Sequence, residues 1–216
     1  MSDSQNHGHM HPYDPDHQHP LQPDHDDTMT YYKLMESAVR HLLIDKKLIT
    51  AEQIRKKVEE MDSRTPVNGA KIVARAWIDE EYKRRLIANP KEAIGELGHD
   101  IGPLNLIVLE NTKKVHNVVV CTLCSCYPRW ILGLPPDWYK SREYRSRVVA
   151  RPRSVLEEFG TVIASEREVR VHDSTADMRY LVLPMRPSGT EKMKEDELAG
   201  LVGRDAMIGV VEVSLS

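Results

Sequence analysis

The sequence has few of the features that would place the chain in a membrane, on nucleic acid or in a secretory pathway. No apolar run approaches the roughly 20 residues that a membrane helix needs, and the N-terminus lacks the apolar stretch of a signal peptide. The 30 Lys and Arg residues are outnumbered by 33 Asp and Glu, so no basic excess favours nucleic acid. We therefore expect a soluble, cytoplasmic protein that binds neither nucleic acid nor a membrane.

Cysteine is scarce, and all of it lies in one place. The chain has 3 cysteines, Cys121, Cys124 and Cys126, in the segment that we call the cysteine loop (residues 121–126). An odd number at such close spacing is a poor disulfide framework and favours a reducing compartment. Concentrating every thiol in one loop requires a chemical explanation.

The 216 residues suffice for one domain and an additional arm. Residues 1–27 are rich in His, Asp and Pro and cannot build a core, which predicts a disordered tail. Residues 28–100 carry helical apolar patterns and predict a helical arm that covers a partner or a second domain. Residues 101–216 mix strand and helix patterns. We expect an α+β fold, in which the arm precedes a layered α-β-β-α domain with a cysteine-rich metal loop.

Local patterns predict the individual elements. The predicted helices begin at Tyr31, at Thr50 with a Thr50–Gln53 capping box, near Ala70 (continuing to Ala88), at Pro90, near Ser141 (to Phe159, with a break at Pro152) and at Glu195. The predicted strands are Leu104–Leu109, Val115–Val120, Val169–His172, Met178–Leu183 and Val210–Ser214. The second of these strands leads directly into the cysteine loop.

The spacing of the cysteine loop allows one metal ion to be chelated by sulfur and main-chain nitrogen together. The Cys124 sulfur, the Ser125 and Cys126 amide nitrogens and the Cys126 sulfur can close fused rings, and Cys121 can bind along the axis. An octahedral metal would keep one open position. Amide nitrogens bind only after losing their protons, which requires a strongly Lewis-acidic, trivalent metal.

Two simpler interpretations of the loop remain open at this level. Zinc would need a fourth Cys or His, and strand alternation does not direct the nearby His116 at the loop. A Cys-x-x-Cys redox pair commonly follows a strand, as here, although the third cysteine and Pro128 weaken that interpretation. A metal carrier or zinc-stabilised module without catalytic activity is thus the alternative from a different class.

The segment Val118–Pro128, VVVCTLCSCYP, resembles the metal-binding segment of nitrile hydratase α subunits and of the related thiocyanate hydrolase γ subunit. Further segments resemble the family in the same order: Gly69-Ala70-Lys71, Ala76-Trp77, Glu110-Asn111-Thr112, Leu132–Pro136, Tyr144–Arg147 and Met207–Gly209. The resemblance runs from about Leu34 to Val210 and leaves out the histidine-rich tail.

The resemblance implies a metal and a set of modifications. Family members hold Co³⁺ or Fe³⁺ through three sulfurs and two main-chain amides. Thr122 is similar to the cobalt type, so one Co³⁺ per chain is expected and iron is less favoured. The family pattern implies that Cys124 is oxidised to a sulfinic acid and Cys126 to a sulfenic acid, while Cys121 stays a thiolate.

The resemblance also implies an activity and partners. Family enzymes are hydro-lyases that hydrate nitriles to amides at a non-corrin Co³⁺ centre. They are active only with a β subunit, as one chain or split in two, commonly as a heterotetramer. The β subunit's arginines bond the oxidised sulfurs, and a cobalt-inserting activator protein is expected.

Catalytic roles follow from the same resemblance. The nitrile carbon is attacked either by the Cys126 sulfenate oxygen or by a water that it activates. Asp173, Asp177 and Arg179 fall where the family has an acid–acid–arginine set around the centre, although the second acid is usually Glu, which places the role of Asp177 in question.

The residues that follow the cysteine loop resemble two enzymes of the family that act on different substrates. Arg129, directly after Pro128, resembles thiocyanate hydrolase. Leu134-Pro135-Pro136 resembles nitrile hydratase, and we favour nitriles.

Overall fold

The computed structural model describes residues 29–123 and 126–215. The predicted tail, residues 1–27, lies outside the described residues, as do Cys124 and Ser125. The chain divides into two compact units, residues 1–51 and 52–216. The helices of the structure are α1 (Tyr31–Asp45), α2 (Ala51–Asp62), α3 (Pro66–Ile78), α4 (Glu80–Ala88), α5 (Pro90–Glu96), α6 (Arg129–Leu132), α7 (Asp137–Lys140), α8 (Arg142–Ala150), α9 (Pro152–Glu158), α10 (Glu195–Leu201) and α11 (Arg204–Ile208).

Within the first unit, α1 begins where the sequence predicts. Thr30 caps it, because the Thr30 hydroxyl accepts a hydrogen bond from the Lys33 amide at 3.3 Å. The helix has no buried residue, and its apolar side chains Leu34, Met35 and Leu42 are exposed. Its apolar face therefore has no cover within the described residues.

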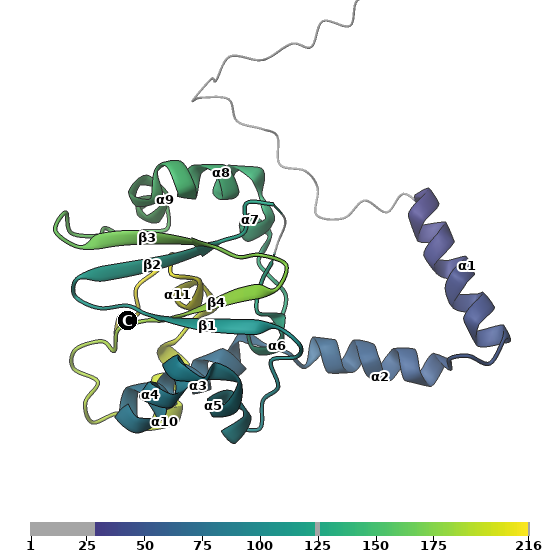
Figure 1. Ribbon diagram of the computed structural model, residues 1–216, viewed down its shortest axis with the longest axis horizontal. Coiled ribbons are helices and arrows are strands. Elements are labelled where there is room, and N and C mark those ends of the chain that lie inside the picture. The colour runs from purple at the N-terminus through teal and green to yellow at the C-terminus, as the bar shows by residue number, and fades with distance from the viewer. Residues whose placement is uncertain (1–28, 124–125, 216) are drawn as a thin grey trace, which may run out of the picture. The chain divides into compact units, whose positions relative to one another are not determined.

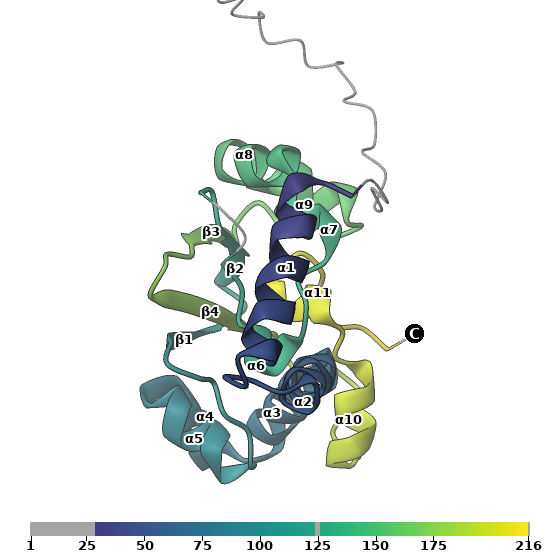
Figure 2. The same ribbon diagram turned by 90° about the vertical axis from the view of Figure 1, so that its right-hand side faces the viewer.

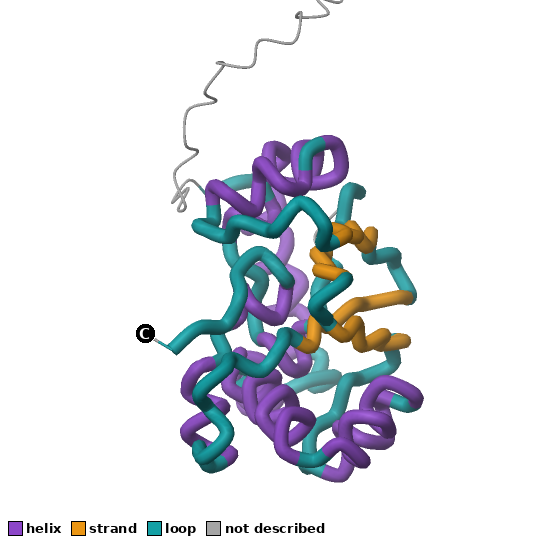
Figure 3. The backbone as a smooth tube through the Cα atoms, turned by 90° about the vertical axis from the view of Figure 1, so that its left-hand side faces the viewer, coloured by secondary structure: helices purple, strands orange, loops and turns teal. Residues whose placement is uncertain are grey.

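Four strands form the centre of the second unit: β1 (Asn105–Glu110), β2 (Val115–Val120), β3 (Glu168–Asp173) and β4 (Met178–Leu183). They make two parallel pairs, β1 with β4 and β2 with β3. Figure 1 shows the strands between α8 and α9 on one side and α3, α4, α5 and α10 on the other, and Figure 3 shows the same layering from the left. The expected mixture of helices and strands in layers is thus present.

The helices α3, α4 and α5 belong to the compact unit that begins at Glu52, so the expected arm boundary at residue 100 differs from the division seen in the structure. Ile72 and Val73 of α3 and Leu86 of α4 are fully buried in the same core as Val118 of β2. α3 packs against α10, more than 100 residues later in the chain (Figure 2). An apolar helix face reveals that a helix is covered, but not by which segment.

The single helix predicted over residues 70–88 is wrong, because α3 and α4 are separated at Asp79. The Asp79 backbone is extended, and its side chain accepts a hydrogen bond from the Tyr82 amide at 2.9 Å. Asp is a favoured N-cap residue, and Glu80 and Glu81 in the first turn complement the helix dipole. The capping pattern therefore begins a new helix at Glu80.

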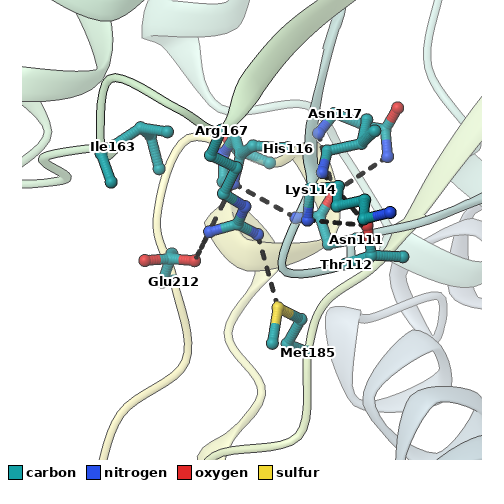
Figure 4. Close-up of polar contacts among 12 residues, drawn as sticks. Asn111, Thr112, Lys114, His116, Asn117, Ile163, Arg167, Met185 and Glu212 are labelled. Atoms are coloured by element: carbon teal, nitrogen blue, oxygen red, sulfur yellow. Dashed lines mark hydrogen bonds and ion pairs between the residues drawn. The ribbon is translucent and has the colours of Figure 1, made fainter.

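The last strand predicted, Val210–Ser214, is also wrong. This segment follows α11 and is held by side chains instead of a strand ladder (Figure 4). The Gly209 carbonyl accepts a hydrogen bond from His116 Nε2 at 2.8 Å, and Glu212 forms an ion pair with Arg167. Alternating valines satisfied the strand pattern, but they are fixed here by contacts distant in sequence.

None of the helices in the described part of the chain is long and apolar enough to span a membrane.

Candidate metal centre

The cysteine loop leaves the carboxyl end of β2, a strand whose last five residues are all buried. β3 pairs with β2 in parallel and ends beside it, with Val120 opposite Asp173. The carboxyl ends of parallel strands meet at one edge of a sheet, which is a common location for ligand sites in open α/β sheets. The topology therefore places Asp173 and the β3–β4 connection beside the loop.

The two cysteines that the structure describes are both buried, Cys121 to 1 % and Cys126 to 9 % relative exposure. The other two predicted ligands, Cys124 and Ser125, lie outside the described residues. Within residues 29–123 and 126–215, no cluster of three His, Cys, Asp or Glu side chains forms a further metal site. Buried thiols on one short loop are donors that suit cobalt, iron, zinc or copper(I).

Asp173 holds the start of the cysteine loop. Its two carboxylate oxygens accept separate hydrogen bonds from Thr122, one from the amide at 2.9 Å and one from the hydroxyl at 2.5 Å. A bidentate contact of this kind fixes both the backbone and the side chain of Thr122. Asp173 was singled out from the sequence, but its partner was not.

Tyr139 of α7 holds the end of the loop. Its hydroxyl donates a hydrogen bond to the Cys126 carbonyl at 2.8 Å, and its side chain is fully buried. Burial raises the pKa of Tyr139 well above its usual range, so the hydroxyl keeps the proton that it donates. Tyr144 of α8 holds the end of β2 in a similar way, because its hydroxyl donates a hydrogen bond to the Val119 carbonyl at 2.7 Å. Tyr139 was not singled out from the sequence, and Tyr144 was named only within a family segment.

Arg145 of α8 also contacts the loop, and the sequence had indicated it only as a member of a family segment. Its Nη1 lies 3.4 Å from the Thr122 carbonyl, and its Nε donates to the Ser141 carbonyl at 3.3 Å. The loop is therefore contacted from α8 as well as from β3. A polar residue at the start of a helix gives no signal in sequence that its partner is a distant loop.

The other two residues of the predicted set lie on the β3–β4 connection and at its end. The Arg179 guanidinium donates to the carbonyls of Thr175, Ala176 (3.0 Å) and Met178 (3.1 Å). Asp177 is exposed on the connection that Arg179 holds. Of the three predicted residues, Asp173 is the one that bonds the described part of the cysteine loop.

A small pocket of about 10 Å³, with room for about one water molecule, lies among residues that include several directly after the loop. Its lining consists of Ile101, Leu104, Leu106, Pro128, Trp130, Ile131 and Arg179. Trp130 is held on its other side by Arg64, whose guanidinium carbon lies 5.1 Å from the ring centroid. Arg129 is exposed and is not among the residues that line this pocket.

His116 is not near the loop, as strand alternation indicated. It lies at the start of β2, fully buried, where Asn111 and Gly209 are its hydrogen-bond partners. Its role is in packing the C-terminal segment.

The chain is similar to known proteins over most of its length. The family model "Nitrile hydratase, alpha chain" matches residues 30–211. The chain is 50 % identical over 177 residues to the α subunit of the low-molecular weight cobalt-containing nitrile hydratase of Rhodococcus rhodochrous, covering 80 % of this chain and 84 % of that one. It is 44 % identical over 191 residues to the thiocyanate hydrolase γ subunit of Thiobacillus thioparus, covering 83 % and 79 %.

Solved structures of the same group share the fold. A double mutant of the Fe-type nitrile hydratase from Comamonas testosteroni Ni1 superimposes with a TM-score of 0.78 at 39 % identity, over 85 % of this chain and 90 % of that one. A recombinant thiocyanate hydrolase with partially modified cobalt centres gives 0.79 at 40 % identity, over 88 % and 95 %. The chain is a member of the group of metal-bearing hydratase and hydrolase subunits that these proteins define. Within that group, it belongs to the nitrile hydratase α chain family.

Proposed function

We propose that the cysteine loop holds one Co³⁺ through Cys121, Cys124, Cys126 and the main-chain nitrogens of Ser125 and Cys126. The sulfur donors suit a soft metal, and the spacing of the loop suits chelation by its own backbone. Cobalt-containing relatives and Thr122 favour cobalt over iron. Cys124 as a sulfinic acid and Cys126 as a sulfenic acid belong to the same proposal.

We propose that the chain is the metal-bearing α subunit of a nitrile hydratase. A bound trivalent metal supplies Lewis acidity that polarises a nitrile. The chain's own contribution is the nucleophile, because the Cys126 sulfenate oxygen either attacks the nitrile carbon or takes a proton from the water that attacks it. Asp173 and Tyr139 hold the loop at its two ends, and Arg179 fixes the connection that carries Asp177.

The observation that carries the choice of nitriles is the match to the nitrile hydratase α chain family, with 50 % identity to a nitrile hydratase α subunit against 44 % to a thiocyanate hydrolase γ subunit. Neutral nitriles need an apolar wall, and Pro128 and Trp130, directly after the loop, are the residues proposed to supply it. Thiocyanate is an anion that an arginine would attract in a low-dielectric pocket. Arg129, the residue that resembles thiocyanate hydrolase, is exposed, as the nitrile interpretation expects, and the arginine that lines the small pocket after the loop is Arg179. Thiocyanate hydrolysis is the alternative outcome.

The partner in this proposal is a β subunit. α1 presents exposed apolar side chains along its length, and a short helix of this kind gains stability by covering another protein. The arginines expected to bond the oxidised sulfurs belong to the β subunit. Cobalt insertion is assigned to an activator protein, and the assembly is expected in the cytoplasm.

The test is metal analysis combined with peptide mass mapping of the full chain purified with its β subunit and activator. We expect near-stoichiometric cobalt, with two added oxygens on Cys124 and one on Cys126. The Cys124→Ser variant should lose the metal, because a hydroxyl is too hard and too weakly acidic to replace the thiolate. Zinc bound by three unmodified thiols would contradict the proposal and favour a structural metal module.

A further inference from the structure

Ser174 lies directly opposite Cys121. It is the first residue after β3, and its amide donates a hydrogen bond to the Val120 carbonyl at 2.7 Å. This bond continues the parallel register that pairs Val120 with Asp173, so the next pair along the two strands is Cys121 with Ser174. Both side chains are buried, which places them on the same, interior side of the chain.

The Ser174 hydroxyl is a buried polar group that lacks a hydrogen bond. The residue is 2 % exposed, and its Oγ has no hydrogen-bond partner among the described residues. Buried hydroxyls are nearly always satisfied in native proteins, so an unpaired one requires an acceptor that is present in the working state.

The surroundings of Ser174 narrow the choice of acceptor. The Tyr139 hydroxyl is its neighbour, and the Cys121 and Cys126 thiols and Arg179 also act on that hydroxyl. The proton of Tyr139 is already donated to the Cys126 carbonyl. Ser174 also acts on the Tyr139 hydroxyl, but its Oγ makes no hydrogen bond of ordinary geometry there, and the side chain at the paired position on the neighbouring strand is that of Cys121.

We propose that Ser174 is a positioning residue that donates a hydrogen bond to the Cys121 sulfur when that sulfur is a metal-bound thiolate. This inference rests on the proposed metal centre. A neutral thiol is a weak acceptor, whereas a thiolate is an anion that accepts strongly. Donors of this type orient a metal ligand and tune the metal, and losing one commonly costs about 10- to 100-fold in metal affinity or activity.

The test uses the full chain purified with its β subunit, as wild type, Ser174→Ala and Ser174→Thr. The hydrogen bond draws electron density from the sulfur, so removing it should move the sulfur-to-cobalt charge-transfer absorption to longer wavelength. We expect S174A to show this shift and to release cobalt to a chelator about 10- to 100-fold faster. S174T keeps the hydroxyl and should behave as wild type in both measurements.

Ser154→Ala, which removes an exposed hydroxyl on α9, is the matched control and should leave band and release rate unchanged. S174A with the wild-type band and release rate would overturn the role of Ser174 even if its melting temperature fell. Equal changes in S174A and S174T would overturn it as well, because packing alone would then explain them. A wild-type complex that holds no cobalt would overturn the metal centre itself, and so distinguishes the two failures.

Discussion

The Thr122 amide and hydroxyl both bond the Asp173 carboxylate, at 2.9 and 2.5 Å, and so join the first turn of the cysteine loop to the end of the neighbouring strand. The two residues are 51 positions apart in the chain. Because the loop contains the predicted metal ligands, we expect the geometry of those ligands to depend on this carboxylate, which is not itself among them.

Removing the Asp173 carboxylate should therefore impair the centre. We expect Asp173→Ala to lower cobalt affinity or kcat by about 10- to 100-fold, as loss of a residue that orients metal ligands commonly does. Thr122→Val removes one of the two bonds and should have a smaller effect. The measurement is cobalt content and amide formation by the purified complex.

Glu168→Gln is the matched control, at the opposite end of β3. Glu168 pairs with Arg170 on the exposed surface, and such pairs contribute little to stability. Wild-type cobalt retention and kcat in Asp173→Ala would show that the contact is incidental.

Tyr139 and Tyr144 offer a matched pair of buried hydroxyls. Tyr139→Phe removes the donor to the Cys126 carbonyl, and Tyr144→Phe removes the donor to the Val119 carbonyl. Each change should lower the free energy of unfolding by about 1 to 3 kcal/mol, because a buried carbonyl loses its partner. Only Tyr139→Phe should also change the charge-transfer spectrum, because only Tyr139 contacts the loop. Equal spectra for the two variants would refute this distinction.

Alanine substitutions at Gly209 and Gly160 distinguish the cost of backbone strain from the cost of steric overlap. Both glycines have a positive φ, +89° and +80°. A Cβ on Gly160 would meet nothing within 4 Å, so Gly160→Ala should cost only about 1 to 2 kcal/mol for the left-handed backbone.

A Cβ on Gly209 would lie 2.0 Å from the Asn117 carbonyl oxygen, which is backbone and cannot move aside. Gly209→Ala should therefore be destabilising by more than about 4 kcal/mol. Thermal unfolding of both variants in the complex checks this, and equal losses would contradict it.

The buried His116 should make the stability of the folded chain depend on pH. Burial lowers its pKa from the ordinary value of 6.5, the nearby Arg167 lowers it further, and the Gly209 carbonyl and Glu212 oppose these effects. The unfolded chain therefore binds the proton at a higher pH than the folded one. The contribution of the neutral, buried His116 to the free energy of unfolding is fully present above about pH 6.5. It is lost as the pH falls through that value toward the pKa of His116 in the folded protein.

The melting temperature should accordingly drop between pH 7 and pH 5, and His116→Gln should make this drop smaller. Burial and Arg170 also lower the pKa of His172, so part of the slope should remain in the variant. The same slope in wild type and variant would exclude His116 as its source.

Local patterns were sufficient for much of the fold. The apolar run Val115–Val120 matches β2, Pro90 and Glu195 begin helices as predicted, and the break predicted at Pro152 separates α8 from α9. The break at Asp79 was available from its capping pattern and was missed because the apolar periodicity continues across it. The C-terminal valines were misassigned because a strand also needs a neighbouring strand, which no local pattern can supply.

The site was predictable where its chemistry is local and not where it depends on the fold. The cysteines follow one another in sequence, and Asp173 could be found by resemblance. Tyr139, Tyr144 and Arg145 bond the backbone of distant segments, and such partners leave no trace in spacing. Ser174 became visible only when burial showed that its hydroxyl lacks an acceptor.

The most direct test of the account is a comparison of acrylonitrile and thiocyanate as substrates for one preparation of the cobalt-loaded complex with its β subunit. The nitrile hydratase family match and the exposed Arg129 predict that amide forms from the nitrile and that thiocyanate is not consumed. Arg129→Ala should leave nitrile hydration unchanged within about 2-fold, since that charge does not line the pocket. Hydrolysis of thiocyanate, with no amide formed from any nitrile, would contradict the proposed function while leaving the family and the cysteine loop in place.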